Sequence, residues 1–262
     1  MVIDRKKWGA EFAEKPATLP WLCPGCQRTM LVLEEGSFHQ GETGASIESM
    51  KHEASEASWL DGRFTTLLRC GACRGVIGVL GTYRLEERMY YDPEGRTAAD
   101  YTTYYRPQFF TDAPHIIPIL EEVPSEVGAE LKASFQQFWG DSESCANHIR
   151  SVVELILTAK RVPKTSGRGG RSPKRGGRLT LHARIERFGE TAPGVADQMM
   201  AIKWIGNAGS HSQAITRDDL LDGYDLMAVV LNELFVRSER RIGALSRAIN
   251  RQRGPRSKKR GI

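Results

Sequence analysis

Four of the five cysteines in this chain form two pairs with the same spacing. Cys23 and Cys26 flank a Pro-Gly dipeptide, and Cys70 and Cys73 flank a Gly-Ala dipeptide. A Cys-x-x-Cys turn lets two thiolates bind one metal ion, and two such turns complete a tetrahedral site with no open position. The 43 residues between the pairs exceed the usual spacing of a zinc ribbon. We therefore predict a structural Zn²⁺ held by these four thiolates.

The remaining metal-binding or nucleophilic candidates are weaker. His39 and His52 lie between the two pairs and are alternative ligands, but four thiolates already satisfy a zinc ion. Cys145 lies on the apolar stripe of a predicted helix, so we expect it to be a core residue and not a nucleophile.

A second set of polar residues lies in the stretch "IKWIGNAGSH". Lys203, Asn207 and His211 follow one another at steps of four, and Gly206 and Gly209 interrupt the helix that would align them. We expect the helix to end near Gly206 and the glycines to bend the chain, so that Asn207 and His211 face a groove. A lone histidine in such a place is more often a hydrogen-bonded structural residue than a catalyst.

Upstream of this stretch, Ala146, Arg150 and Glu154 share one face of a predicted helix. An arginine that precedes a glutamate by four residues is the weaker order for a salt bridge within a helix. The two charges therefore either pair on the helix surface or have partners elsewhere in the bundle.

The net charge of +5 is unevenly distributed. The segments 160–178 and 251–262 hold eight and six Lys or Arg residues and no acid, so the rest of the chain is net acidic. Basic segments of this kind suit phosphate-rich partners, although Gly/Ser/Pro-rich basic segments are also simply well solvated. The nucleic-acid-binding candidates of the first segment are Lys160, Arg161, Lys164, Arg168, Arg171, Lys174, Arg175 and Arg178.

The N-terminal part of the chain is predicted to be rich in β-strands. After a lead of residues 1–20, residues 21–110 contain the strand-like runs "MLVLEE", "RFTTLLRC" and "GVIGVLGTYRLEERMYY". The polar run at 36–62 is predicted to be an irregular insertion. Four prolines within 107–124 predict an extended connector, which we place at 111–124.

Helical periodicity begins at residue 125 and continues to about 250. Ser125 is expected to cap the first helix, and Asp141 or Ser142 to open the next one. A capping box of Thr216 and Asp219 opens a long last helix, and residues 251–262 form a basic, disordered tail. The apolar stripe of the second helix consists of Cys145, Ile149, Val152, Val153 and Ile156. The predicted fold class is α+β, a β-rich zinc-ribbon-like part followed by an all-α bundle.

No stretch approaches the roughly 18 consecutive apolar residues of a membrane-spanning helix. The first residues also lack the apolar core of a signal peptide. We therefore expect a cytoplasmic protein without a membrane partner.

The helical half also carries a family resemblance. The spacing of Ala146, Arg150 and Glu154, a variable loop, "LHARIERFG", "IKWIGNAGSH" and a terminal helix together resemble the bacterial family called domain of unknown function 4145. That family looks like a branch of the HEPN superfamily (higher eukaryotes and prokaryotes nucleotide-binding), all-α bundles found in antiphage defence, toxin and restriction contexts. Its pattern is R-x-x-x-E followed by R-x-x-G-N-x-x-x-H, preceded in some members by a pair of cysteine knuckles. The resemblance spans roughly 23–235.

Two departures from the family pattern matter for activity. Lys203 stands where the family has arginine, which keeps the charge but loses the planar fork for phosphate. Active HEPN ribonucleases typically carry an arginine shortly before the histidine. This chain has no arginine there and instead has Trp204, Ile205 and Gly206 at the corresponding positions.

The favoured functional prediction is a binding protein. The resemblance and the basic segments together imply a zinc-containing module that binds RNA or DNA or interacts with other proteins. Its context would be bacterial defence or nucleic-acid processing, with partner proteins of a defence system. We expect it to form a homodimer through the helical domain.

The alternative is a metal-independent endoribonuclease of HEPN type. The resemblance then implies that His211 moves a proton at the RNA 2′-hydroxyl or the leaving 5′-oxygen, while Asn207 holds the phosphate. Lys203 would stabilise charge on the phosphorane, and Arg150 or Glu154 would orient the histidine. A third hypothesis, in which tyrosines of the β-rich part stack on DNA bases, is less favoured because tyrosines at strand spacing usually form cross-strand pairs.

Overall fold

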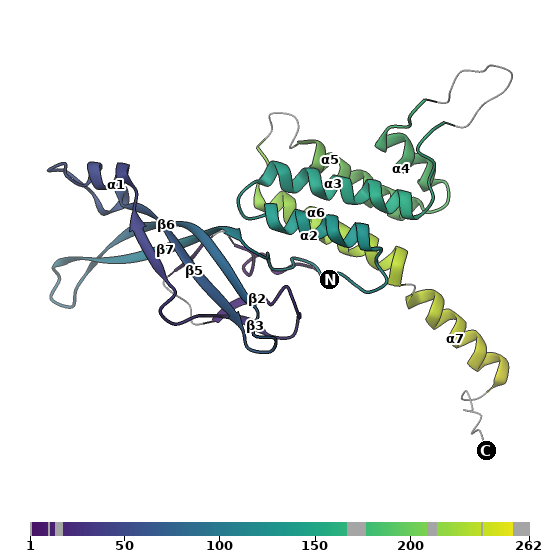
Figure 1. Cartoon of the computed structure of the whole chain (residues 1–262), viewed down its shortest axis with the longest axis horizontal. Coiled ribbons are helices and arrows are strands. Elements are labelled where there is room, and N and C mark those ends of the chain that lie inside the picture. Colours follow the sequence, from purple (N-terminus) through teal and green to yellow (C-terminus); the bar gives the residue numbers. More distant parts are fainter. Residues whose placement is uncertain are drawn as a thin grey trace.

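The computed structural model describes residues 2–9, 11–13, 18–166, 177–208, 214–236 and 238–253. The N-terminal part is a curled antiparallel sheet and the C-terminal part is a bundle of helices, as Figure 1 shows. The predicted α+β fold class is therefore confirmed.

The sheet is antiparallel throughout its described strands, in the order β1-β7-β6-β5-β3-β2, with β4 added to the edge of β5. Burial alternates along the strands, so one face packs on the core and the other lies exposed. The strands are β1 (Phe12–Ala13), β2 (Thr18–Leu22), β3 (Met30–Leu33), β4 (His39–Glu42), β5 (Asp61–Cys70), β6 (Val76–Tyr91) and β7 (Thr97–Phe110).

Two parts of the sheet differ from the sequence prediction. The run at 36–62 is not simply irregular, because it contains β4, the short helix α1 (Gly44–Ser49) and the 3₁₀ turn η1 (Ala57–Trp59). Thr43 caps α1 by accepting a hydrogen bond from the Ser46 amide at 3.1 Å. Strands β6 and β7 are long and continue beyond β5 as a two-stranded ribbon.

The helices of the bundle pack around α3, whose predicted apolar stripe is buried. Asp141 caps α3 through a hydrogen bond from the Ser144 amide, as predicted. The Ser125 prediction was wrong by one residue, because Pro124 is the N-cap of α2 and no side chain caps that helix. The bundle consists of α2 (Ser125–Gln137), α3 (Ser142–Ala159), α4 (Leu181–Gly189), α5 (Pro193–Ala208) and α6 (Arg217–Leu231).

The last predicted helix is divided. Its capping box of Thr216 and Asp219 is present, but α6 passes into a π-helical turn, η2 (Asn232–Val236), before α7 (Ser238–Gln252). The carbonyl of Leu234 in this turn accepts a hydrogen bond from Lys160 Nζ at 2.6 Å. Helix α7 extends away from the bundle (Figure 1).

The sheet and the bundle share one core around Trp139. The Trp139 ring centroid lies 4.9 Å from that of Trp21 and 4.8 Å from that of Phe110, and Trp8 lies 6.0 Å away. Arg217 donates a hydrogen bond to the Trp139 carbonyl at 2.8 Å. Burial lowers the pKa of Arg217 to about 10, so this guanidinium is still charged at neutral pH.

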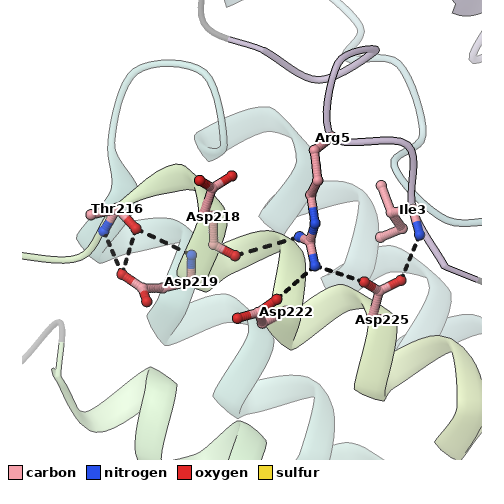
Figure 2. A network of polar contacts seen from close by, with 7 residues as sticks. All are labelled: Ile3, Arg5, Thr216, Asp218, Asp219, Asp222 and Asp225. Atoms are coloured by element: carbon pink, nitrogen blue, oxygen red, sulfur yellow. Dashed lines mark hydrogen bonds and ion pairs between the residues drawn. The ribbon is translucent and has the colours of Figure 1, made fainter.

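The N-terminal lead is attached to α6 by a polar network (Figure 2). The guanidinium of Arg5 contacts the Asp222 carboxylate at 2.6 Å and the Asp225 carboxylate at 2.8 Å. The backbone amide of Ile3 donates to the second of these carboxylates at 2.8 Å. Residues from the two ends of the sequence are therefore held together.

Helix α5 runs through Gly206 and is described as far as Ala208, two residues beyond the predicted end. The bend expected at Gly206 and Gly209 stays a prediction, because residues 209–213 lie outside the described residues. A Cβ atom at Gly206 would lie 2.5 Å from Arg150 Cβ and 3.0 Å from the Ala146 carbonyl oxygen. The glycine therefore allows α5 to approach α3 closely, where any side chain would clash with Arg150 Cβ.

This contact gives a stability prediction. We expect Gly206→Ala to lower the free energy of unfolding by about 1 to 3 kcal/mol, because the added methyl overpacks the α3–α5 contact. Gly194→Ala in the first turn of the same helix is the matched control, since no atom lies within 4 Å of its Cβ position. It should leave stability unchanged or raise it by up to about 1 kcal/mol. Urea denaturation of both variants measures this, and equal midpoints would refute the packing role.

Candidate metal and anion-binding sites

Each predicted Cys-x-x-Cys pair forms the turn of a β-hairpin. Cys23 and Cys26 lie between β2 and β3, whereas Cys70 ends β5 and Cys73 lies between β5 and β6. Strand β3 pairs with β5, and Leu31 lies opposite Cys70 in this pairing. The two turns are consequently neighbours at one end of the sheet, although they are far apart in the sequence.

The two turns share one backbone pattern. The Gln27 amide donates to the Cys23 carbonyl at 2.9 Å, and the Arg74 amide donates to the Cys70 carbonyl at 3.0 Å. Both donor residues adopt the left-handed conformation, with φ of 54° for Gln27 and 62° for Arg74. A non-glycine residue in this conformation costs about 1 to 3 kcal/mol. This left-handed residue occurs at the same position of both turns, so the two turns have the same backbone shape, which directs the two thiols of each turn toward one point.

The four sulfur atoms have the spacing of metal ligands. All lie within 4.8 Å of one another, with Cys23 and Cys73 at 3.7 Å and Cys26 and Cys70 at 3.6 Å. A disulfide would need about 2.05 Å, whereas a tetrahedral ion with metal–sulfur bonds of about 2.3 Å separates its sulfurs by about 3.8 Å. The predicted cysteine cluster is confirmed, and its geometry is compatible with a metal site.

The environment of the thiols also favours a bound cation. Hydrogen bonds from the Cys73 amide and the Thr29 hydroxyl lower the pKa of Cys70 to about 5. Burial instead raises the pKa of Cys23 to about 12, because its thiolate would lose its hydration. A divalent cation with an affinity for sulfur stabilises all four thiolates together. Four protein ligands leave no open position, so such an ion has a structural role.

Metal removal should destabilise the sheet. We expect one metal ion per chain in the purified protein, and we expect Cys70→Ser to lose it and to lower Tm by more than about 10 °C, since a structural zinc ion contributes on the order of 10 kcal/mol. Cys145→Ala is the control, because the buried Cys145 contacts Tyr224 and lies outside the cluster. Elemental analysis and thermal melts measure both effects, and a metal-free wild-type protein would contradict the prediction.

A second polar site lies where α4 and α5 meet. Lys203 is nearly buried as a residue, and its Nζ lies 3.5 Å from the centroid of the Trp204 ring and 3.4 Å from His182 Nδ1. Trp204 is 56% exposed, and the His182 ring meets it edge-on at 6.2 Å. His182 Nε2 in turn lies 3.3 Å from a carboxylate oxygen of Glu186. The site combines an exposed indole, a cation and an imidazole.

The predicted Arg150 and Glu154 lie on the adjacent helix α3. Arg150 Nη2 is 3.4 Å from Glu154 Oε1, so the two do pair within the helix despite their unfavourable order. The buried Arg184 of α4 donates to the Glu154 carbonyl at 3.4 Å and to Thr158 Oγ1 at 3.1 Å. Burial lowers the pKa of Arg184, and the nearby Arg178 lowers it further.

The other predicted residues have different positions. Asn207 is half-buried in the last turn of α5, whereas His211 lies outside the described residues. In the basic segment, Lys160 contacts the Leu234 carbonyl, and its ammonium lies 4.1 Å from the Phe235 ring centroid. Arg161, Lys164 and Arg178 are described, and Arg168, Arg171, Lys174, Arg175 and the tail from 254 lie outside the described part.

The two ends of the basic segment 160–178 are hydrogen-bonded to each other. The Leu179 amide donates to the Lys164 carbonyl at 2.9 Å, and the Ser166 amide donates to the Gly177 carbonyl at 3.0 Å. This short bridge places Arg178 immediately before α4. The basic segment therefore begins and ends beside the helix that carries His182.

His182, Glu186 and Trp204 are the site residues that the sequence analysis missed. His182 and Glu186 are four residues apart in "LHARIERFG", which indicates a shared helix face. No spacing connects either residue with Trp204, because their contact depends on how α4 packs on α5.

Comparisons with known families match the sheet and most of the helical part to two separate family models. Residues 132–252 match the family model described as Domain of unknown function (DUF4145). The predicted resemblance is thus confirmed for the helical part. It does not extend to the cysteines, since residues 11–110 match a separate model, Domain of unknown function (DUF8608), which covers β1 to β7. No curated protein and no solved structure gave a match.

None of the described helices combines the length and the apolar composition needed to cross a lipid bilayer.

Proposed function

We propose that this protein is a zinc-stabilised, single-stranded nucleic-acid-binding protein whose binding site lies on its DUF4145 segment. The observation that carries the proposal is the exposed Trp204 ring beside the Lys203 ammonium. Proteins that bind single strands combine aromatic rings, on which bases stack, with cations that contact phosphate. A base paired within a duplex cannot offer its face to the indole, so the site favours unpaired RNA or DNA.

The basic segment supports the same proposal. Its ends are fixed beside α4, and Arg178 lies near Arg184 on the helix that contacts Trp204 through His182. The described ends of the segment, Arg178 included, are therefore attached next to the helix that carries His182. Their contribution to affinity should fall steeply with salt, because each phosphate contact releases counterions.

The proposed zinc ion has a structural role. Trp21 lies two residues before Cys23 and packs against Trp139, which lies between α2 and α3. The zinc site would stabilise the sheet, and the sheet in turn supports the bundle that carries the binding site.

Binding can be tested with a labelled, unstructured oligonucleotide. We expect Trp204→Ala to weaken binding about 5- to 160-fold, since stacking of one base contributes about 1 to 3 kcal/mol. Trp59→Ala is the matched control, because Trp59 is also exposed and lies 6.3 Å from a histidine ring, that of His52, but belongs to the sheet region. Fluorescence anisotropy at two salt concentrations measures both. Equal affinities of the two variants would refute the site.

A specific observation keeps the ribonuclease alternative open. His182 lies between Lys203 and Glu186, the arrangement of a general base with an orienting carboxylate and a cation for the phosphate. His211, the histidine expected from the sequence, stays a prediction. If the protein is a nuclease, it should cleave RNA without added metal, leave 2′,3′-cyclic phosphates and spare DNA.

Mutations can distinguish between the two candidate histidines, His182 and His211. Loss of cleavage in His182→Ala with activity retained in His211→Ala would assign the reaction to the α4–α5 site, and the reverse result would assign it to the family motif. Binding without cleavage in the wild type would leave the protein a binder. The antiphage role implied by the resemblance stays a prediction.

A further inference from the structure

The four thiols of the cysteine cluster differ in their access to solvent. Cys23 and Cys70 are buried, with 2% and 1% of their surface exposed, and Cys26 is half-buried. Cys73 is the exposed member of the cluster. Solvent access and a neighbouring thiol are the features that make a cysteine react with oxidants. A dissolved oxidant therefore reaches Cys73 before the other three.

Hydrogen bonds further distinguish the two thiols of the β5–β6 turn. The Thr29 hydroxyl lies 3.2 Å from Cys70 Sγ, and the amides of Ala72 and Cys73 donate to the same sulfur at 3.4 Å and 3.5 Å. A thiolate that is stabilised by donors is a weaker nucleophile. Cys70 is thus protected by burial and by hydrogen bonds, whereas its neighbour in the same turn faces solvent.

The closest sulfur contacts described for the cluster join different turns. Cys73 Sγ lies 3.7 Å from Cys23 Sγ, and Cys26 Sγ lies 3.6 Å from Cys70 Sγ. The sulfurs of a disulfide are about 2.05 Å apart, so the first pair has to close by about 1.7 Å. These contacts favour a covalent link between the β2–β3 turn and the β5–β6 turn over a link within one turn.

We propose that Cys73 is an oxidation site for hydrogen peroxide and that Cys23 resolves it into a disulfide between the two turns. The Cys73 thiolate attacks one peroxide oxygen, the O–O bond breaks and hydroxide leaves, which gives a sulfenic acid. The Cys23 thiolate then attacks the Cys73 sulfur. The S–S bond forms, the S–O bond breaks and a second hydroxide leaves. The two thiolates lose two electrons in all, and one peroxide molecule takes them up.

This disulfide changes the metal site without separating the two turns. Only Cys26 and Cys70 then remain as thiolate ligands, which are too few for a tetrahedral sulfur site, so the oxidised chain should lose its metal ion. The new bond connects the same two turns that a metal ion would connect. We therefore expect the oxidised protein to keep the fold of the sheet and to bind metal again after reduction by a dithiol. The proposal does not depend on nucleic-acid binding.

Peroxide treatment of the full-length, zinc-loaded protein tests the proposal. Trypsin places Cys23 and Cys26 in the peptide 8–28 and Cys70 and Cys73 in the peptide 70–74. Mass spectrometry without reduction therefore separates links between the turns from links within one turn. After an equimolar amount of hydrogen peroxide, we expect the two peptides to be joined through Cys23 and Cys73, and zinc to be released to a coloured chelator in proportion to the link. A link confined to one peptide, or zinc retained by the linked protein, overturns the proposal.

Two matched variants test the order of attack. Cys26→Ser and Cys73→Ser each remove the second thiol of one turn, so they should weaken metal binding and folding alike. Cys26→Ser retains Cys23 and Cys73 and should form the link between the turns as fast as the wild type, whereas Cys73→Ser should form such a link several-fold more slowly. Equal rates in the two variants overturn the role of Cys73.

A trapping experiment on the wild type does not depend on the folding of either variant. A 1,3-diketone, which reacts with sulfenic acids, should label Cys73 before Cys26, Cys23 or Cys70 when it is present during peroxide treatment. The buried Cys145 is the internal control and should remain an unmodified thiol. A first label on any other thiol of the cluster overturns the proposal.

Discussion

Four thiols held within 4.8 Å of one another cannot all ionise in a partly buried place without a cation, and the rest of the structure depends on that constraint. A metal ion held by all four thiolates would join the β2–β3 turn to the β5–β6 turn and stabilise the register between the two hairpins. Trp21 lies near the end of β2, two residues before Cys23, and packs on Trp139. The proposed metal site is therefore linked to the helices through a contact between aromatic rings.

Close packing in the bundle determines where its polar side chains gather. Gly206 allows α5 to lie against Arg150 and Ala146 of α3. Lys203, one turn earlier, is then nearly buried, while the neighbouring Trp204 points to solvent beside His182. The exposed ring and the cation are thus a consequence of helix packing, and the basic segment is attached where α4 begins. A proposed binding site of this kind needs no cleft, because a base stacks on an exposed ring.

The amino-acid sequence by itself determined the features that depend on local spacing. Two Cys-x-x-Cys turns indicated one metal site, helical periodicity identified the buried stripe of α3, and Asp141 and Thr216 marked helix starts, because each of these signals acts within a few residues. Only the tertiary structure showed that Gly206 lets α5 pack closely against Arg150 and Ala146 of α3. The same holds for His182 beside Trp204. Their neighbours come from other helices and strands, and which residues meet there is set by packing and strand register, which no local pattern encodes.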